Sequence, residues 1–297
     1  MVKNRNPSRK IFMIFNTVLF IGVILVCLIP VLHVVFASLS DPHWVQAQQG
    51  IIYRIKGFNL NGYKLVFQNH SLLISYANTF LYVFSATAIG MLITVMGAYA
   101  LSRKDFLWAN LIMFAITFTM LFSGGIIPFY MVVTNVLGWY DSRLAVIIPA
   151  CVSTFNLIVV RTSMATIPPS MEESARIDGA NRFVVLFRII LPLIKPTLAT
   201  IILYYAVGHW NSWFNASIFL TTRDKFPLQL VLKEILISND ISSTTTLSST
   251  DFSSDSVLFK ETIKYCTIVI SSAPVFIFYP FIQKYFESGV MIGAVKG

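Results

Sequence analysis

The charged side chains between residues 170 and 196 have types and spacing that suit contact with another protein. Ser170 followed by Glu173 has the spacing of a capping box, so we expect Ser170 to start a short helix. Gly179 tolerates the positive φ at which such a helix ends, and a second amphipathic helix is expected to stop at Pro192. A polar helix between two apolar segments is suited to contact something outside a membrane. The charged residues of the two predicted helices and of the turn between them are Glu172, Glu173, Arg176, Asp178, Arg182 and Arg188.

Amide and aromatic side chains inside the apolar segments form a second set of candidates. Amides in lipid cost free energy unless they are hydrogen-bonded or face water. Aromatic faces stack on sugar C–H surfaces and amides bond hydroxyl groups, so the set suits a sugar path. Its Tyr and Trp residues equally suit a belt at the membrane edge, and both interpretations stay open. The candidates are Asn78, Asn156, Tyr205, Trp210, Asn211, Trp213 and Asn215.

No pattern in the sequence indicates catalysis. There is no GxxxxGK[ST] phosphate-binding loop, no HExxH motif and no paired-cysteine motif. No predicted span carries Asp, Glu, Lys or Arg near its middle, which argues against an ion-coupled carrier and an intramembrane enzyme. We therefore expect no catalytic residue, no metal site and no cofactor bound by this chain. Energy for any transport must then come from another subunit.

The composition is typical of a protein with many membrane spans. Hydrophobic residues make up 56% and charged residues 12% of the 297 positions, and the mean hydropathy is +0.73. Soluble domains have roughly 45–50% apolar and about 25% charged residues. The net charge of +9 comes from Lys and Arg residues beside the apolar segments. We interpret it as cytoplasmic loop charge and not as a nucleic-acid surface.

The apolar segments predict an all-α polytopic membrane protein with six transmembrane helices and both termini in the cytoplasm. A span needs about 20 apolar residues, and most of the 22 Lys and Arg residues fall on the predicted inner side. Gly124, Gly125 and Pro128 interrupt the third span, which indicates either a packing kink or a cavity lining. The predicted order is a basic cytoplasmic N-terminus (1–10), a first span (11–36), an extracellular loop (37–71), a core of five spans (72–286) and a cytoplasmic tail (287–297). The core spans are expected at about 72–101, 106–133, 142–160, 197–220 and 264–286, with a cytoplasmic loop at 163–196 and a polar extracellular loop at 221–263.

The polar loop resembles the cytoplasmic loop of ABC importer membrane subunits, whose pattern is Glu-Ala-Ala, three residues, Gly, nine residues, Ile-x-Leu-Pro. Here Glu173-Ser174-Ala175 precedes Gly179 by three residues, and Ile189-Ile190-Leu191-Pro192 follows nine residues later. Ser174 is the one departure, a small residue for a small residue. Further segments are similar to the maltose-type second permease of the carbohydrate-uptake branch, and within it to the group that serves complex oligosaccharides in Gram-positive bacteria. These segments are SGGIIPFYMVV, VGHWNSWFNA, FPLQLVLKEIL and the terminal GAVKG.

The resemblance implies a type I ABC importer transmembrane domain, a multi-pass location in the plasma membrane and import of oligosaccharides. It implies a coupling helix over about residues 171–178 that docks on an ATPase subunit. The partners it implies are a second, homologous permease in a heterodimer, two ATPase subunits that use ATP and Mg²⁺, and an extracellular solute-binding lipoprotein. An ABC importer for another solute, such as an amino acid or peptide, and an ion-coupled secondary sugar carrier are the alternatives. The coupling residues that it implies are Glu172, Glu173, Ala175, Asp178, Gly179, Leu191, Pro192 and Lys296.

Overall fold

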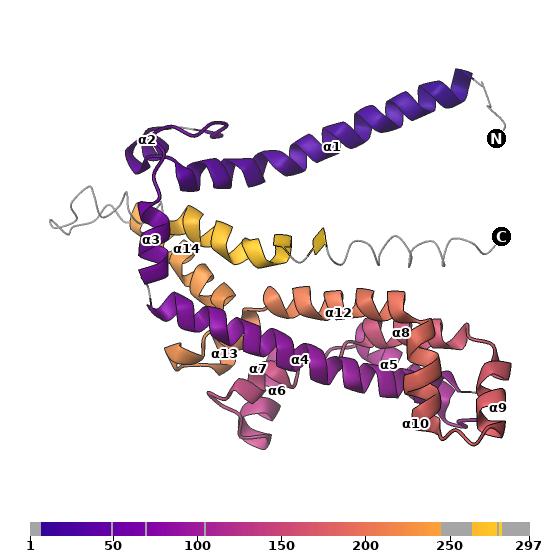
Figure 1. Ribbon diagram of the computed structural model, residues 1–297. Coiled ribbons are helices and arrows are strands. Elements are labelled where there is room, and N and C mark those ends of the chain that lie inside the picture. Colours follow the sequence, from indigo (N-terminus) through magenta and orange to yellow (C-terminus); the bar gives the residue numbers. More distant parts are fainter. Residues whose placement is uncertain are drawn as a thin grey trace. The chain divides into compact units, whose positions relative to one another are not determined.

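The computed structural model describes residues 7–48, 50–68, 70–103, 105–244, 263–277 and 279–280. All regular elements in these ranges are helical (Figure 1), which confirms the all-α expectation for them. The chain divides into two compact units. The first comprises Met1–Asn69 with Leu232–Ser272, and the second comprises His70–Val231 with Ala273–Gly297.

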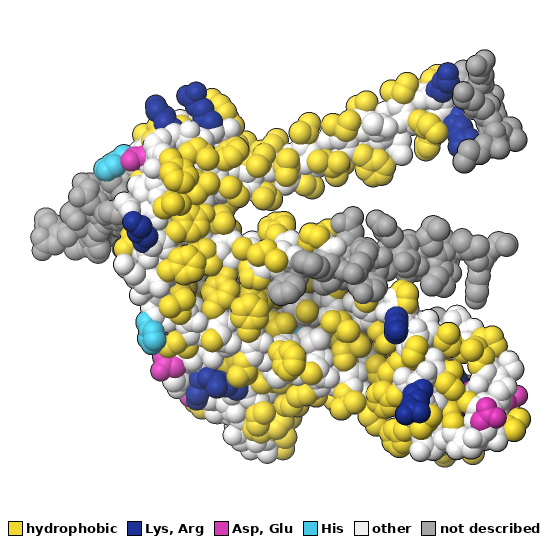
Figure 2. All heavy atoms as spheres, in the orientation of Figure 1, with side chains coloured by type: hydrophobic (Ala, Val, Ile, Leu, Met, Phe, Trp, Pro, Cys, Tyr) yellow, Lys and Arg dark blue, Asp and Glu magenta, His cyan; other side chains and the backbone are white. Residues whose placement is uncertain are grey.

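Helix α1 (Pro7–Leu39) dominates the first unit. Its apolar side chains are exposed along its length, with Phe12 66% and Val26 70% exposed. Figure 2 shows hydrophobic side chains covering this helix. Exposing so much apolar surface to water costs free energy, whereas the same surface is stable in the hydrocarbon of a membrane. The helix is long enough to cross a bilayer.

Two short helices follow α1 inside the predicted extracellular segment 37–71. They are α2 (Pro42–Ala47) and α3 (Asn61–Gln68). The hydroxyl groups of Ser38 and Tyr63 lie 2.7 Å apart and hydrogen-bond, which joins the end of α1 to α3. The segment is therefore a folded connection held by its own contacts.

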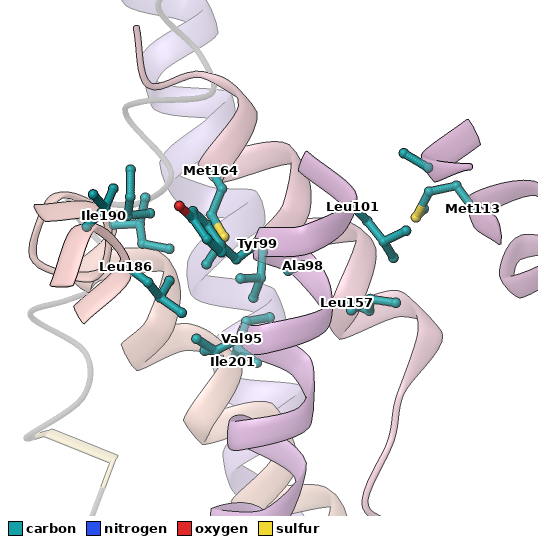
Figure 3. Packing of buried hydrophobic residues seen from close by; sticks show 14 of the residues in the cluster. Val95, Ala98, Tyr99, Leu101, Met113, Leu157, Met164, Leu186, Ile190 and Ile201 are labelled. Carbon is teal, nitrogen blue, oxygen red and sulfur yellow. The ribbon is translucent and has the colours of Figure 1, made fainter. Parts of the chain in front are cut away.

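Three helices pack together to form the core of the second unit. They are α4 (His70–Ser102), α8 (Thr154–Ala165) and α12 (Lys195–Trp210). Buried side chains from these helices interdigitate with those of the polar-loop helices, and Figure 3 shows Val95 and Ile201 within this cluster. Burial of apolar side chains is the main favourable term that holds such a bundle together.

Gly90 permits the closest approach in this core. A Cβ atom at Gly90 would lie 2.2 Å from the carbonyl oxygen of Cys151. Only a residue without a side chain fits there, so α4 touches the backbone that links α7 (Arg143–Ile147) to α8.

Two sharp bends break the remaining apolar helices. Helices α5 (Ala109–Leu121) and α6 (Ile126–Met131), the latter continued by the wider-turn segment Val132–Val136, meet at 114°. Gly125 has φ +83° at the start of α6, a conformation that favours glycine. The predicted interruption of the third apolar segment is therefore a bend and not a small kink.

A second bend of 87° separates the helical run Arg182–Leu193 from α12. In the part of the chain that the structure describes, α1 and α4 are each long and apolar enough to cross a membrane, and the number rises to four if each bent pair is one span. The predicted span at 142–160 consists of α7 and α8 with a break between them, and α8 continues to Ala165. The predicted span at 197–220 contains α12, which begins at Lys195 and ends at Trp210, and the short α13 (Phe214–Phe219).

The expected polar loop at 221–263 is wrong over its first half. The short helix Arg223–Lys225 (η3) is followed by α14 (Leu228–Thr244). Leu228 is 1% exposed, and its backbone N–H donates to the Thr79 hydroxyl at 2.8 Å. The apolar start of α14 packs on α4, whereas the polar run that follows in the sequence suggested a solvated loop. An apolar helix at Ile263–Ile277 overlaps the predicted sixth span and begins one residue before it.

Candidate functional site

Helix α9 (Pro169–Ile177) contains the first half of the polar loop. It begins two residues before the predicted position, with Pro168 in place of Ser170 at the N-cap and no side-chain cap, so the capping box of Ser170 with Glu173 is not formed. Pro169 at the first helical position has the right φ and needs no partner for an N–H group. The proline pair therefore starts the helix without the Ser170 hydroxyl.

The C-terminal end of α9 is a Schellman motif centred on Gly179. Gly179 has φ +82° and donates to the carbonyl of Arg176 at 3.0 Å, while Ala180 donates to the carbonyl of Ala175 at 2.9 Å. The prediction that Gly179 ends the helix at positive φ is confirmed. The motif fixes the direction in which the chain leaves α9.

The two faces of α9 have different surroundings. Glu172 and Ala175 are buried against the core of the second unit. Glu173 is exposed, as are Met171 (41%) and Ile177 (87%). Glu173 and Ile177 are four residues apart and therefore share one exposed face of α9, an acidic residue beside an uncovered apolar one, which is a surface that suits contact with another protein.

Glu172 ties α9 to the end of α4. Its carboxylate forms ion pairs with Arg103 and, at 2.8 Å, with Arg176, and it accepts a hydrogen bond from the Tyr99 hydroxyl at 2.9 Å. Burial raises the pKa of Glu172, but the hydrogen bond from Tyr99 and the charges of Arg103 and Arg176 outweigh burial, so its pKa lies below the ordinary value. Because all these partners belong to the same chain, Glu172 acts here as an internal anchor.

A second ion-pair link joins the polar loop to α5 through Asp105. Its carboxylate accepts from Arg182 at 3.0 Å and lies 3.9 Å from Arg176. Arg182 belongs to α10 (Arg182–Val184), the first turn of the helix after Gly179. The turn around Asp105, between the predicted spans at 72–101 and 106–133, therefore holds the polar loop through these ion pairs.

The second helix of the loop does not stop at Pro192. It runs through α10, the wider-turn segment Val185–Ile190 and α11 (Leu191–Leu193), and it ends one residue after the predicted position. Ile194 has φ −104° and ψ 19° between the two helices that meet at 87°. Leu191 and Pro192 therefore lie immediately before the bend into α12. Lys296, the last predicted coupling residue, lies outside the described residues.

A pocket of about 510 Å³ lies between α8 and α12 and contains two of the predicted substrate-path residues, Asn156 and Tyr205. The Tyr205 hydroxyl hydrogen-bonds the Thr94 hydroxyl at 2.7 Å and accepts from the Ser153 backbone N–H at 3.1 Å. The hydroxyl of Tyr205 is thus engaged by the protein.

The pocket lining also includes residues that were not predicted from the sequence, among them four with polar or aromatic side chains. These are Ser153, Phe155, Tyr204 and His209. Tyr204, Tyr205 and His209 stand one and four residues apart on α12, so helical spacing could have grouped them. The His209 Nε2 atom is buried and has no hydrogen-bond partner among the described residues. The pocket offers aromatic faces and uncharged polar groups, a mixture that suits sugar rings and hydroxyl groups.

Asn78 serves the scaffold in this structure. Its amide nitrogen donates to the carbonyl of Asp224 at 2.7 Å and to that of Phe226 at 3.2 Å. Its amide oxygen accepts from Arg143 at 3.1 Å. These bonds connect the segment around η3 to α4 and engage both the nitrogen and the oxygen of the Asn78 amide within the chain.

The other predicted substrate-path residues lie near the C-terminal end of α12 and outside the lining of the pocket. Trp210 is buried and stacks edge-on against Tyr76 and Phe80, with ring centroids 6.1 and 5.3 Å away. The Asn211 amide donates to the carbonyl of Val207 at 3.0 Å. Trp213 packs edge-on against Phe214, and Asn215 lies half-buried in α13. The structure brings Asn156 and Tyr205 together and leaves these four apart from them.

The sequence of this chain is similar to a family of transport proteins and to several of its members. Residues 87–292 match the family model described as the binding-protein-dependent transport system inner membrane component. The chain is 39% identical, over 92% of its length and 94% of the relative, to a polygalacturonan/rhamnogalacturonan transport system permease protein of Bacillus subtilis. It is 25% identical to an arabinooligosaccharides transport system permease protein of the same organism, over 98% of this chain and 99% of the relative.

A solved structure shares the fold. It is a bacterial ABC transporter involved in the import of the acidic polysaccharide alginate, with a TM-score of 0.83 and 34% sequence identity over 95% of this chain and 98% of that one. The match covers both the polar loop with α9 and the helices around the pocket. The chain belongs to the family of binding-protein-dependent transport system inner membrane components, the membrane permease subunits of ABC importers.

Proposed function

We propose that this chain is a permease subunit of an ATP-driven, binding-protein-dependent importer of oligosaccharides, with fragments of complex glycans as its solutes. The support is that relatives along nearly the whole chain are named for polygalacturonan, rhamnogalacturonan and arabinooligosaccharide transport. The uncharged, aromatic pocket at Asn156 and Tyr205 is compatible with such solutes. The chain crosses the membrane six times with both termini in the cytoplasm, and it contributes no catalytic residue.

The observation that carries the mechanism is the exposed face of α9. Glu173, with Ile177 one turn away on the same face, docks in a groove of an ATPase subunit, while Ala175 lets α9 lie close to the core of its own chain and Gly179 sets the direction in which the chain leaves the helix. Asp178 ends the contact, and Lys296 reaches the ATPase pair from the C-terminal tail. Motion of α9 passes through Leu191 and Pro192 to the bend before α12.

The assembly contains a second, homologous permease and two ATPase subunits that bind ATP and Mg²⁺. An extracellular lipid-anchored binding protein delivers the sugar. ATP binding closes the ATPases, draws the two coupling helices together and turns the permease pair outward, and hydrolysis resets it. We take the domain order expected from the sequence as part of this proposal. The segment at 221–263 contains helix α14.

Uptake of defined oligosaccharides by cells tests the proposal. Cells that carry the whole transporter, with paralogues removed, should lose uptake when Glu173 is changed to Lys, while the chain still inserts in the membrane. Arg188→Glu is the control, because Arg188 is exposed in the same loop but is not a coupling residue. Undiminished uptake with Glu173→Lys would contradict the coupling role, and uptake of amino acids or peptides in place of sugars would contradict the solute class.

A further inference from the structure

A second pocket, of about 390 Å³, lies where the C-terminal end of α4 meets α9 and α10. Its lining has a charged part, the cationic side, with Arg103, Arg176, Arg182 and the carboxylate of Asp105. It also has an apolar part, the apolar side, which includes Phe106 and Phe183. The pocket shares no lining residue with the pocket at Asn156 and Tyr205, and neither Glu173 nor Ile177 of α9 lines it.

The cationic side of this pocket has unused capacity for an anion. Arg103 and Arg176 both pair with the Glu172 carboxylate, and the Asp105 carboxylate lies 3.9 Å from Arg176 and 3.0 Å from Arg182. The Arg176 and Arg182 side chains are 42% and 70% exposed. Three guanidinium groups therefore face two carboxylates, and because each guanidinium has five N–H donors, donors remain for oxygen atoms of another group. Planar guanidinium pairs match phosphate oxygens well.

The apolar side and the position of the pocket indicate an amphipathic occupant. Tyr99, in the last turn of α4, and Arg103, directly after it, line the pocket at the end of a 33-residue helix suited to cross a membrane. Phe106 is 38% and Phe183 is 62% exposed. This places a phosphate-binding side and an apolar side together at the level where headgroups meet acyl chains.

We propose that this pocket binds the headgroup of an anionic phospholipid, with its phosphate on Arg176 and Arg182 and its glycerol and upper acyl chains on Phe106 and Phe183. Such a lipid would fill the space under α9 and α10 and contact both helices of the polar loop. The inference does not depend on the transported solute, so it can fail while the proposed function stands.

The full chain purified in a nonionic detergent is mixed with phosphatidylglycerol or phosphatidylcholine, and retained lipid is measured by native mass spectrometry. Phosphatidylglycerol should be retained more strongly than phosphatidylcholine. Arg182→Gln should reduce its retention about fivefold, the effect of removing one surface cation. Arg188→Gln, an exposed arginine of the same helical run that does not line the pocket, is the matched control.

Two further variants separate lipid binding from misfolding and from binding of free phosphate. Asp105→Asn removes the competing carboxylate and should raise retention of phosphatidylglycerol about fivefold, a gain that misfolding cannot produce. Phe183→Ser should lower retention, whereas Phe187→Ser, exposed outside the pocket, should not. Equal retention of the two lipids, equal losses with Arg182→Gln and Arg188→Gln, or displacement of lipid by inorganic phosphate would overturn the proposal.

Discussion

The Glu172 carboxylate bonds to the Arg103 guanidinium, which joins the middle of α9 to the end of α4. Both side chains are largely buried, at 8% and 13% exposure. Only one residue further along, Glu173 points outward. Neighbouring glutamates therefore have opposite tasks, since one holds the helix in place and the other is available to a partner.

Changing Glu172 to Gln should destabilise the chain while the same change at Glu173 should not. Glu172→Gln leaves Arg103 without a counter-charge in a buried site, at a cost of roughly 2 kcal/mol or more. Glu173→Gln alters an exposed group and should stay within about 0.5 kcal/mol. Thermal unfolding of the two variants in detergent measures the difference, and equal melting temperatures would refute the anchor role.

Low pH should weaken the contact of Glu172 with Arg103 that attaches α9 to the end of α4. The folded pKa of Glu172 lies below its value of about 4.3 in an unfolded chain. The stabilisation by its carboxylate is thus fully present above that unfolded value and is lost as the pH falls through the lower folded pKa. Protease cleavage of the polar loop should therefore stay slow down to about pH 4.3 and accelerate below it. Cleavage that accelerates already between pH 7 and 5 would indicate another group.

Gly90→Ala should disturb the core, whereas Gly97→Ala should be tolerated. The new methyl group at Gly90 would meet the backbone oxygen of Cys151 at 2.2 Å, and backbone cannot move aside cheaply. At Gly97 the neighbour is the Leu157 Cδ1 atom at 3.3 Å, the end of a flexible side chain. We expect a loss of about 1–3 kcal/mol for Gly90→Ala, seen in thermal unfolding. Matching stabilities would mean that α4 sits further from the α7–α8 link.

Gly179→Pro should abolish uptake with little effect on membrane insertion. Proline holds φ near −65°, whereas Gly179 has +82°, and proline lacks the N–H that bonds to Arg176. The Schellman motif is lost and the chain leaves α9 in another direction. Gly179→Ala, which strains φ but keeps the N–H, should cost about 1–2 kcal/mol and retain part of the uptake. Oligosaccharide uptake and membrane fractionation are the two measurements.

Asn78→Ala should lower stability without changing the apparent affinity for sugar. It removes the partner of Arg143 and leaves the carbonyls of Asp224 and Phe226 unbonded, for about 1–3 kcal/mol. Tyr204→Ala, in the pocket lining, should instead raise the KM for uptake. A raised KM for Asn78→Ala at unchanged stability would return Asn78 to the substrate path.

Local signals in the sequence were sufficient for part of this structure. The apolar run from about residue 72 to 101 placed α4 to within two residues, and Gly179 marked the end of α9. The start of α9 was wrong because the proline pair at 168 and 169 needs no capping side chain. Both outcomes depend on residues that are adjacent in the chain.

Partners distant in the sequence could not be predicted in this way. The task of Asn78 depends on carbonyls of Asp224 and Phe226, which lie about 150 residues away. Helix α14 was expected to be a loop because the burial of Leu228 against α4 is a tertiary effect. The lining of the pocket at Asn156 and Tyr205 was predicted only in part, because Ser153 joins it from the break before α8 and Phe155 from the first turn of α8.

The hydroxyl of Tyr205 is a joint between three helices. It holds Thr94 of α4 and the backbone at Ser153, where α8 begins, and Tyr205 itself belongs to α12. Thr94 and Ser153 are both bonded to this one hydroxyl, so a displacement of α12 relative to α4 or to the start of α8 would break one of the two hydrogen bonds.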